Sequence, residues 1–207
     1  MSSITRRRRS KGPETRTAVE DAIIGAMGRL SAGGHSFTAV SVEELAAEAG
    51  IARSTFYLHF HDKSELVRRL MKRVTHELLD ATNVWFESEH PENPSRLEQS
   101  LRGIAHVYLK YQAIMQAITE TAAYDEDVAS MFRETMSNLS TNTRAVVKRG
   151  QKEGWVRLDV TPEVADALTW MVERCCLQLL TTQKATQRER MIGALTHVVS
   201  RSLFAAT

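Results

Sequence analysis

The sequence predicts an all-α protein with about nine helices, and three observations lead to this prediction. Helix breakers are few, with four prolines and ten glycines in 207 residues, and strand-like alternation is almost absent. Several segments open with a short polar residue followed three positions later by Glu, the reciprocal capping pattern of a helix start. Between these starts, apolar residues recur at three- and four-residue spacing, as on one face of a helix.

The capping pattern and the breakers divide the chain. The capping pairs are Ser41/Glu44, Asp62/Glu65, Ser95/Glu98 and Thr186/Glu189. Thr161 before Pro162 marks another start, because Pro suits the first helical position. Gly33, Gly34, Gly50 and Gly154 mark helix ends. The predicted helices cover residues 13–30, 42–49, 53–60, from 63, from 95, 114–122, 125–152, 162–182 and 187–204.

Charge is unevenly distributed along the chain. The net charge is +2, but residues 1–16 alone carry +5, so the remainder carries −3. A basic arm on a mildly acidic body is typical of proteins that contact nucleic acid. No apolar run approaches the roughly 18 residues of a membrane span, and no secretory signal follows the basic start. The two cysteines are adjacent and lack metal spacing, so we expect a reduced, cytoplasmic protein without cofactor or metal.

A helix-turn-helix is predicted at residues 42–60. Leu45, Ala46 and Ala49 form the inward side of its first helix, and Gly50 permits the turn. The second helix is about 12 Å long at 1.5 Å per residue, which suits a helix that enters the DNA major groove. Phe56 and Phe60 lie four apart, so we expect both to pack inward.

The block TAVSVEELAAEAGIARSTFYLHFHDKSEL, residues 38–66, resembles the DNA-binding segment of TetR-type transcriptional repressors. The shared features are the small-residue turn, the aromatic cluster TFYLHF and a Lys at the start of the next helix. The resemblance covers about residues 15–75, and beyond them it depends on helix number and spacing. His61–Asp62 departs from the Pro–Ser of many members. The basic arm and helix lengths are similar to the branch that contains the ethionamide-resistance repressor.

The candidate DNA-binding residues combine both lines of argument. Arg can read guanine with two hydrogen bonds, and Ser and Thr bind bases or phosphates. The resemblance implies phosphate contacts for Tyr57 and Lys63, whereas His59 lies near phosphate or is structural. The basic arm either reaches a minor groove or is simply solvated. The candidates are Arg6, Arg7, Arg8, Arg9, Thr38, Ser41, Arg53, Ser54, Thr55, Tyr57, His59 and Lys63.

The last two predicted helices are apolar around most of their circumference. Such helices need cover on two sides, which we expect from the chain's own core and from a second chain. The prediction is a two-fold homodimer joined by a four-helix bundle, as the resemblance also implies, reading a palindromic site. The candidate interface residues are Val172, Cys176, Leu180, Leu195 and Val199.

A small, mainly apolar effector is the expected ligand of the C-terminal domain. Met and aromatic side chains adapt to apolar ligands, and Glu173 stands in an otherwise apolar helix, where it could fix one polar group of the effector. The alternative is that these side chains are core and that Glu173 forms a dimer salt bridge. The candidates are Tyr108, Tyr111, Met115, Met131, Phe132, Met136, Trp170 and Glu173.

The sequence thus predicts a basic arm (1–12), a three-helix helix-turn-helix DNA-binding domain (13–62) and a helical ligand-binding and dimerisation domain (63–207). We expect a transcriptional repressor released from an operator by its effector. The alternative is an architectural DNA-binding protein without an effector. An enzyme is not expected, because no phosphate-binding, nucleophile-elbow or zinc-protease motif is present.

Overall fold

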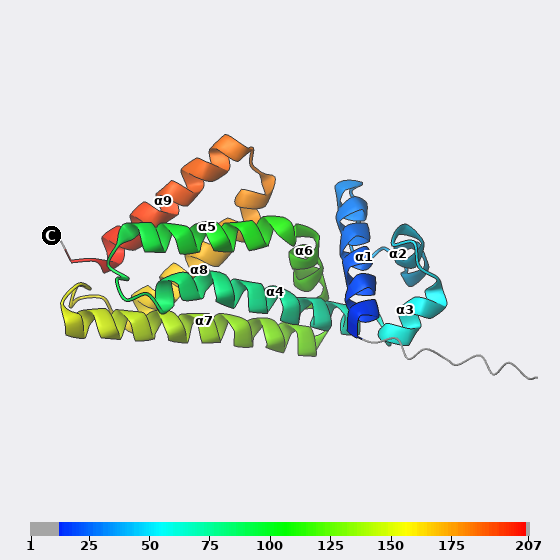
Figure 1. The fold of residues 1–207 in the computed structure, drawn as a ribbon, viewed down its shortest axis with the longest axis horizontal. Helices are drawn as coiled ribbons and strands as arrows, with labels where there is room; N and C mark the ends of the chain where they lie inside the picture. Colours follow the sequence, from blue (N-terminus) through cyan, green and yellow to red (C-terminus); the bar gives the residue numbers. More distant parts are fainter. Residues whose placement is uncertain (1–12, 206–207) are drawn as a thin grey trace, which may run out of the picture. The chain divides into compact units, whose positions relative to one another are not determined.

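The computed structural model describes residues 13–205, and the arginines at 6–9 lie outside the described residues. In the described part the chain forms nine α-helices, one short 3-10 helix and no strand, which confirms the all-α prediction (Figure 1). These residues divide into two compact units, one ending at Leu66 (unit 1) and one beginning at Val67 (unit 2). The predicted domain boundary at residues 62/63 falls four residues earlier, at the start of a helix.

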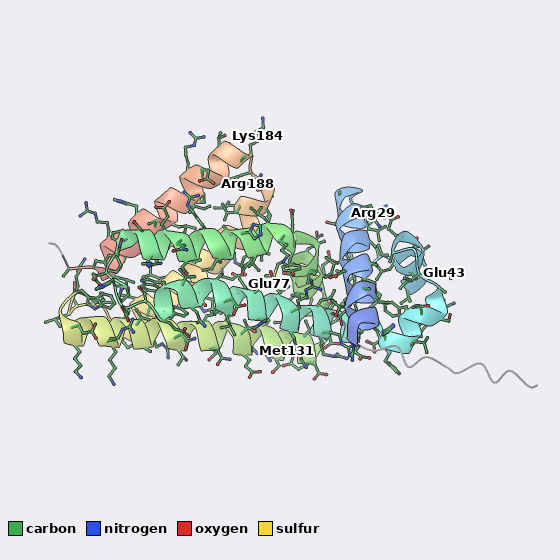
Figure 2. All side chains as sticks on the ribbon, viewed as in Figure 1. Arg29, Glu43, Glu77, Met131, Lys184 and Arg188 are labelled. Atoms are coloured by element: carbon green, nitrogen blue, oxygen red, sulfur yellow. The ribbon has the colours of Figure 1, made fainter. Side chains whose placement is uncertain are left out.

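Unit 1 contains α1 (Pro13–Ala32), α2 (Val42–Glu48), α3 (Arg53–His59) and the first residues of α4 (Lys63–Phe86). Apolar residues at four-residue spacing on α1, Val19, Ile23 and Met27, are buried. In the picture α1 carries Arg29, whose guanidinium donates to the Glu48 carbonyl at 2.6 Å and pairs with the Glu48 carboxylate (Figure 2). This contact joins α1 to the end of α2.

Unit 2 contains the rest of α4 and five further α-helices. They are α5 (Pro94–Lys110), α6 (Gln112–Thr121), α7 (Glu126–Glu153), α8 (Pro162–Gln178) and α9 (Ala185–Leu203), with the 3-10 helix η1 (Leu180–Thr182) after α8. Within this unit α4, α5 and α7 run lengthwise, α5 packs on α9, and α7 packs on α8 (Figure 1). The apolar faces of these helices meet in one core.

Helix starts test the capping predictions directly. The Ser41/Glu44 box is present at α2, Asp125 caps α7 through the Val128 amide, and Pro162 takes the first position of α8 after Thr161. Two predicted starts are wrong by one or two residues. Asn93 caps α5, with Pro94 at its first position, and α9 begins at Ala185. Asn is a strong cap, and Pro next to it fixes the first helical turn.

The predicted helix 162–182 is shorter in the structure. The α-helix ends at Gln178, and residues 180–182 form the tighter η1. Lys184 immediately precedes α9, and Arg188 lies in the first turn of that helix (Figure 2). Among residues 13–205, no helix has both the length and the apolar character that a bilayer span requires.

Candidate functional site

The turn between α2 and α3 depends on Gly50. Its φ is +67°, in the left-handed region that glycine adopts without strain. The Gly50 amide donates to the Ala47 carbonyl, and the Ile51 amide donates to the Ala46 carbonyl, each at 3.0 Å. These bonds satisfy the last carbonyls of α2 and redirect the chain into α3. The predicted helix-turn-helix is therefore present.

The start of α2 is fixed by a reciprocal capping box. The Ser41 hydroxyl accepts from the Glu44 amide at 3.1 Å, and the Glu44 carboxylate accepts from the Ser41 amide at 2.7 Å. The hydrogen bond from the Ser41 backbone holds the pKa of Glu44 below its ordinary value. The hydroxyl of Ser41 thus has a structural role, and its contact with phosphate stays a prediction.

One face of α3 is anchored in the core of unit 1. Phe56 and Phe60 are fully buried, and their ring centroids lie 5.2 Å apart. The expected inward packing of these two aromatics is confirmed. Together they fix the rotation of α3 about its own axis, which decides which side chains face outward.

The opposite face of α3 presents polar and aromatic groups to solvent. Arg53, Ser54 and Tyr57 are exposed, and Leu58 is exposed as well. The Arg53 guanidinium lies over the Tyr57 ring at 5.7 Å and 3.9 Å from the carboxylate of Glu43, which Figure 2 labels on α2. This face offers a cation, a hydroxyl and a phenol in one short helix.

Two predicted DNA residues lie at the margin of this face. Thr55 and His59 are half-buried, and the His59 imidazole lies 6.2 Å from the Phe60 ring. The sequence left the face of His59 open, and the structure puts the side chain at the boundary between buried and exposed. Thr38, before α2, is exposed, and its hydroxyl lies 2.7 Å from that of Ser36.

Lys63 is engaged inside unit 1. Its ammonium donates to the carbonyls of Phe37, Thr38 and Val40 at 2.5, 3.2 and 2.6 Å, and it lies 4.5 Å from the centre of the Phe37 ring. Lys63 therefore ties the start of α4 to the turn before α2. Its three acceptors lie 23–26 residues upstream, so no local pattern in the sequence indicated this role.

Unit 2 contains a cavity of about 80 Å³ with an almost entirely apolar lining. Side chains from α4, α5, α7, α8 and α9 contribute to it. The lining is Leu78, Thr82, Trp85, Phe86, Leu97, Ser100, Leu101, Ile104, Tyr108, Met136, Leu139, Thr143, Leu168, Thr169, Val172, Glu173, Val199 and Leu203.

Glu173 is the only residue of that lining with a carboxyl group. The residue is 4% exposed, and neither carboxylate oxygen accepts a hydrogen bond. The nearest cation is the Arg174 guanidinium, 3.6 Å away on a half-exposed side chain. Burial raises the pKa of Glu173, which Arg174 only partly offsets. Burial likewise raises the pKa of Tyr108 across the cavity.

Three of the eight predicted ligand-binding residues line this cavity: Tyr108, Met136 and Glu173. Two others have structural contacts instead. Tyr111 is buried, and its hydroxyl donates to Glu77 on α4 at 2.5 Å. Met115 on α6 is buried in the apolar core of unit 2. Burial would raise the pKa of Glu77, but hydrogen bonds from Lys110 and Tyr111 outweigh it and hold that pKa below its ordinary value.

The remaining three predicted ligand residues lie away from the lining. Met131 is near the N-terminal end of α7, more than a turn before Met136 (Figure 2). The rings of Phe132 and Trp170 pack edge to face at 6.2 Å, and Trp170 is 42% exposed. These residues were predicted from apolar spacing along a helix. That spacing does not show which of the side chains line a cavity and which are exposed to solvent.

The predicted interface residues lie mostly inside the single chain. Cys176, Leu180, Leu195 and Val199 are buried within the chain itself, and Val172 and Val199 line the cavity. The packing of α5 against α9 and of α7 against α8 already covers them. The large apolar side chains that α8, α9 and the residue after α8 leave exposed are Trp170, Val198 and Leu179.

The described residues contain no group of three or more His, Cys, Asp or Glu side chains that could hold a metal ion. Cys175 is half-buried and Cys176 buried, and burial raises the pKa of Cys176 to about 12. A thiol with such a pKa is protonated and unreactive at neutral pH.

A helix-turn-helix whose second helix is anchored on one side and polar on the other, followed by a helical unit with an apolar cavity, defines a DNA-binding transcriptional regulator. Comparison with known families agrees with this class. Residues 31–70 match the model of bacterial regulatory proteins of the tetR family, and residues 97–205 match that of the C-terminal domain of the transcriptional regulator EthR. The chain belongs to the TetR family of transcriptional regulators, near the EthR branch.

Individual relatives agree with this assignment. The chain is 26% identical over 170 residues to the HTH-type transcriptional regulator EthR of Mycobacterium tuberculosis, covering 80% of this chain and 78% of that protein. It is 25% identical to EthR of Mycolicibacterium smegmatis over 175 residues, covering 81% and 78%.

Solved structures share the fold. A putative transcriptional regulator from Saccharomonospora viridis, in complex with choline, has a TM-score of 0.73 at 15% identity, covering 94% of this chain and all of that one. NalD, the secondary repressor of the MexAB-OprM multidrug efflux pump in Pseudomonas aeruginosa, has a TM-score of 0.71 at 16% identity, covering 92% and 100%.

Proposed function

We propose that the protein is a dimeric repressor that binds a palindromic operator through α3 and leaves it when a small, mainly apolar effector enters the cavity of unit 2. The two-sided α3 carries this proposal, because Phe56 and Phe60 hold it from behind while Arg53, Ser54 and Tyr57 remain exposed. The proposed role is binding rather than catalysis, and it is exerted in the cytoplasm on double-stranded DNA.

Phosphate and base contacts are proposed for different side chains. Arg53 at the start of α3 suits a base edge, and Tyr57 suits a phosphate. Thr38, Ser54, Thr55 and His59 flank them. Ser41 and Lys63 support the geometry from within unit 1, and the arginines at 6–9 remain candidates for an adjacent minor groove.

The helix α4 supports a route from effector to DNA. It is continuous from Lys63, which holds the turn before α2, to Leu78, Thr82 and Trp85, which line the cavity. An effector that favours one position of this helix changes the operator affinity of the N-terminal unit. Couplings of this kind typically amount to about 1–3 kcal/mol, or roughly 5–150-fold in affinity.

Exposed apolar side chains support a homodimer through α8 and α9. Trp170, Leu179 and Val198 are each 41–42% exposed, and exposed apolar groups that gather in one patch can mark a protein–protein interface. A second copy of the chain related by a two-fold axis would cover the same three groups on both partners.

The DNA part of the proposal is tested by fluorescence anisotropy with duplexes from beside the protein's own gene. We expect Arg53→Ala to lower affinity by about tenfold, as for loss of one base-reading arginine. Arg190→Ala removes an equal charge from an exposed position of α9 and should leave affinity unchanged. Equal affinities for wild type and Arg53→Ala would contradict the assignment of α3.

The effector part is tested by adding a panel of small apolar compounds to the protein–DNA complex. Release by a compound that also binds the free protein supports the repressor. The alternative, an architectural DNA-binding protein, predicts operator affinity that no cavity ligand changes.

A further inference from the structure

The carboxylate of Glu173 is placed in the cavity of unit 2 without a full partner. The residue is 4% exposed, and both oxygens are buried without a hydrogen bond. An unpaired buried carboxylate is strongly unfavourable, so it either keeps its proton or is stabilised by a cation that enters the cavity. From this arrangement we infer that the cavity is a site for a lipophilic cation, whose protonated amine pairs with Glu173 while its hydrocarbon part fills the apolar lining. The inference specifies the effector class and so depends on the proposed function.

The chain's own cation does not complete this site. The Arg174 guanidinium approaches only to 3.6 Å, beyond hydrogen-bond distance, and its side chain is 53% exposed. Solvent screens a pair with such an exposed partner, so Arg174 leaves most of the buried charge uncompensated. A ligand ammonium inside the cavity would meet the carboxylate with little water between them, where the attraction is much stronger.

The charged and titratable groups near Glu173 do not compete for it. The lining residues from α4, α7 and α9 carry no titratable side chain, and α5 contributes only Tyr108. On α8, Cys176 is buried, and burial raises the pKa of its thiol to about 12, so it is neutral. Burial also raises the pKa of Tyr108, so its phenol is neutral as well. The lining therefore holds one negative charge at most and no positive one.

The remaining lining suits the rest of such a ligand. Trp85, Phe86 and Tyr108 contribute aromatic surface, which attracts cations through the ring faces and also packs against alkyl chains. Hydroxyls of Thr82, Thr143 and Thr169 add a few acceptors. A cavity that holds one carboxylate and several aromatic rings should bind an alkylammonium better than a neutral or anionic molecule of equal length.

The test compares three probes of matched size: hexylamine, 1-hexanol and hexanoate. Calorimetric titration of the full chain should give hexylamine at least about tenfold higher affinity than 1-hexanol at pH 7, with hexanoate weakest. Each tenfold step corresponds to about 1.4 kcal/mol. A protonated Glu173 that donates to a neutral acceptor would instead favour 1-hexanol, and that result would overturn the inference.

Two variants separate charge from shape. Glu173→Gln should lower hexylamine affinity at least about tenfold and leave 1-hexanol affinity unchanged or higher. Glu173→Asp keeps the charge and should retain the preference for hexylamine over 1-hexanol. The inference would be overturned if Glu173→Gln bound hexylamine as tightly as wild type does. It would also be overturned if Glu173→Asp still bound 1-hexanol but no longer preferred hexylamine. The wild-type comparison decides the inference if a variant does not fold.

Operator DNA distinguishes this inference from the proposed function. Hexylamine binding that depends on Glu173 but leaves the protein–DNA complex intact supports the cation site and contradicts effector-induced release. Release by 1-hexanol with no preference for hexylamine supports the proposed function and overturns the cation site.

Discussion

At the scale of single residues, Glu173 links the cavity to folding stability. Because burial raises its pKa in the folded protein, the folded chain keeps a proton that the unfolded chain loses once the pH exceeds the ordinary value of 4.5. Stability therefore falls as the pH rises from 4.5 through the raised pKa. Glu173→Gln removes this loss of stability. We therefore expect the variant's free energy of unfolding to exceed that of wild type by about 1 kcal/mol at pH 8, and by little at pH 4.

Urea unfolding of both proteins at pH 4, 6 and 8 measures this difference. Glu163→Gln is the control, since Glu163 is exposed and hydrogen bonds hold its pKa below the ordinary value. A difference between wild type and Glu173→Gln that does not grow with pH would show that Glu173 is not destabilised by its charge.

Lys63 gives a second prediction at this scale. Its ammonium serves three carbonyls, so Lys63→Met should lower the free energy of unfolding by about 1–3 kcal/mol. If Lys63 also contacts phosphate, as the sequence predicts, the salt dependence of operator binding should weaken by about one unit of slope. Arg53→Ala provides the comparison, because Arg53 is exposed and its loss should affect binding with little effect on stability.

The contrast between these residues explains what the sequence could predict. Phe56 and Phe60 were assigned correctly because their four-residue spacing is a property of α3 alone. The role of Lys63 depends on carbonyls more than twenty residues away, and the role of Tyr111 depends on Glu77, so local spacing carries no information about them.

At the scale of helices, capping chemistry predicted some helix starts correctly and others not. Ser41 and Asp125 cap their helices as predicted, but Ser95 lies inside α5 because Asn93 and Pro94 begin it earlier. The cavity could not be predicted in the same way. Its lining comes from five helices. Tertiary packing decides where the apolar faces of these helices meet closely and where they leave a space.

The C-terminal end of α7 provides a prediction for a whole element. Gly150 is buried, and a Cβ there would lie 2.7 Å from the Trp155 ring, so the chain returns against this glycine. Gly150→Ala should destabilise the protein by about 1–3 kcal/mol despite the higher helix propensity of Ala. Gly193→Ala in α9 meets nothing within 4 Å and should stabilise by about 1 kcal/mol.

Thermal and urea unfolding of the two glycine variants measures this pair directly. If Gly150→Ala and Gly193→Ala raised the free energy of unfolding by similar amounts, the segment at Trp155 and Val156 would move aside at no cost. Opposite signs would show that this close approach, together with the bridge between Val156 and Phe204, fixes the end of unit 2.

At the scale of the whole molecule, the proposed dimer would bring two copies of α3 to one DNA. A two-fold dimer presents them to half-sites about 34 Å apart, so each copy raises the effective concentration of the other. Linked sites of this kind gain roughly 100- to 10,000-fold in affinity over one alone. If α8 and α9 form the interface as proposed, a change in their exposed apolar surface lowers DNA affinity although neither helix contacts DNA.

Val198→Asp should turn the proposed dimer into a monomer, because it places a charge among exposed apolar groups that the second copy would cover. Val198 is 41% exposed, so the fold of the single chain should change by no more than about 0.5 kcal/mol. Leu158→Asp is the matched control, since Leu158 is 85% exposed and lies outside α8 and α9. Sedimentation should give a dimer for wild type and for Leu158→Asp, and a monomer for Val198→Asp. Compared with wild type, Val198→Asp should bind a full operator at least about 100-fold more weakly. Its affinity for a half-site should equal that of wild type. A dimeric Val198→Asp, or a monomeric Leu158→Asp, would move the interface away from α8 and α9.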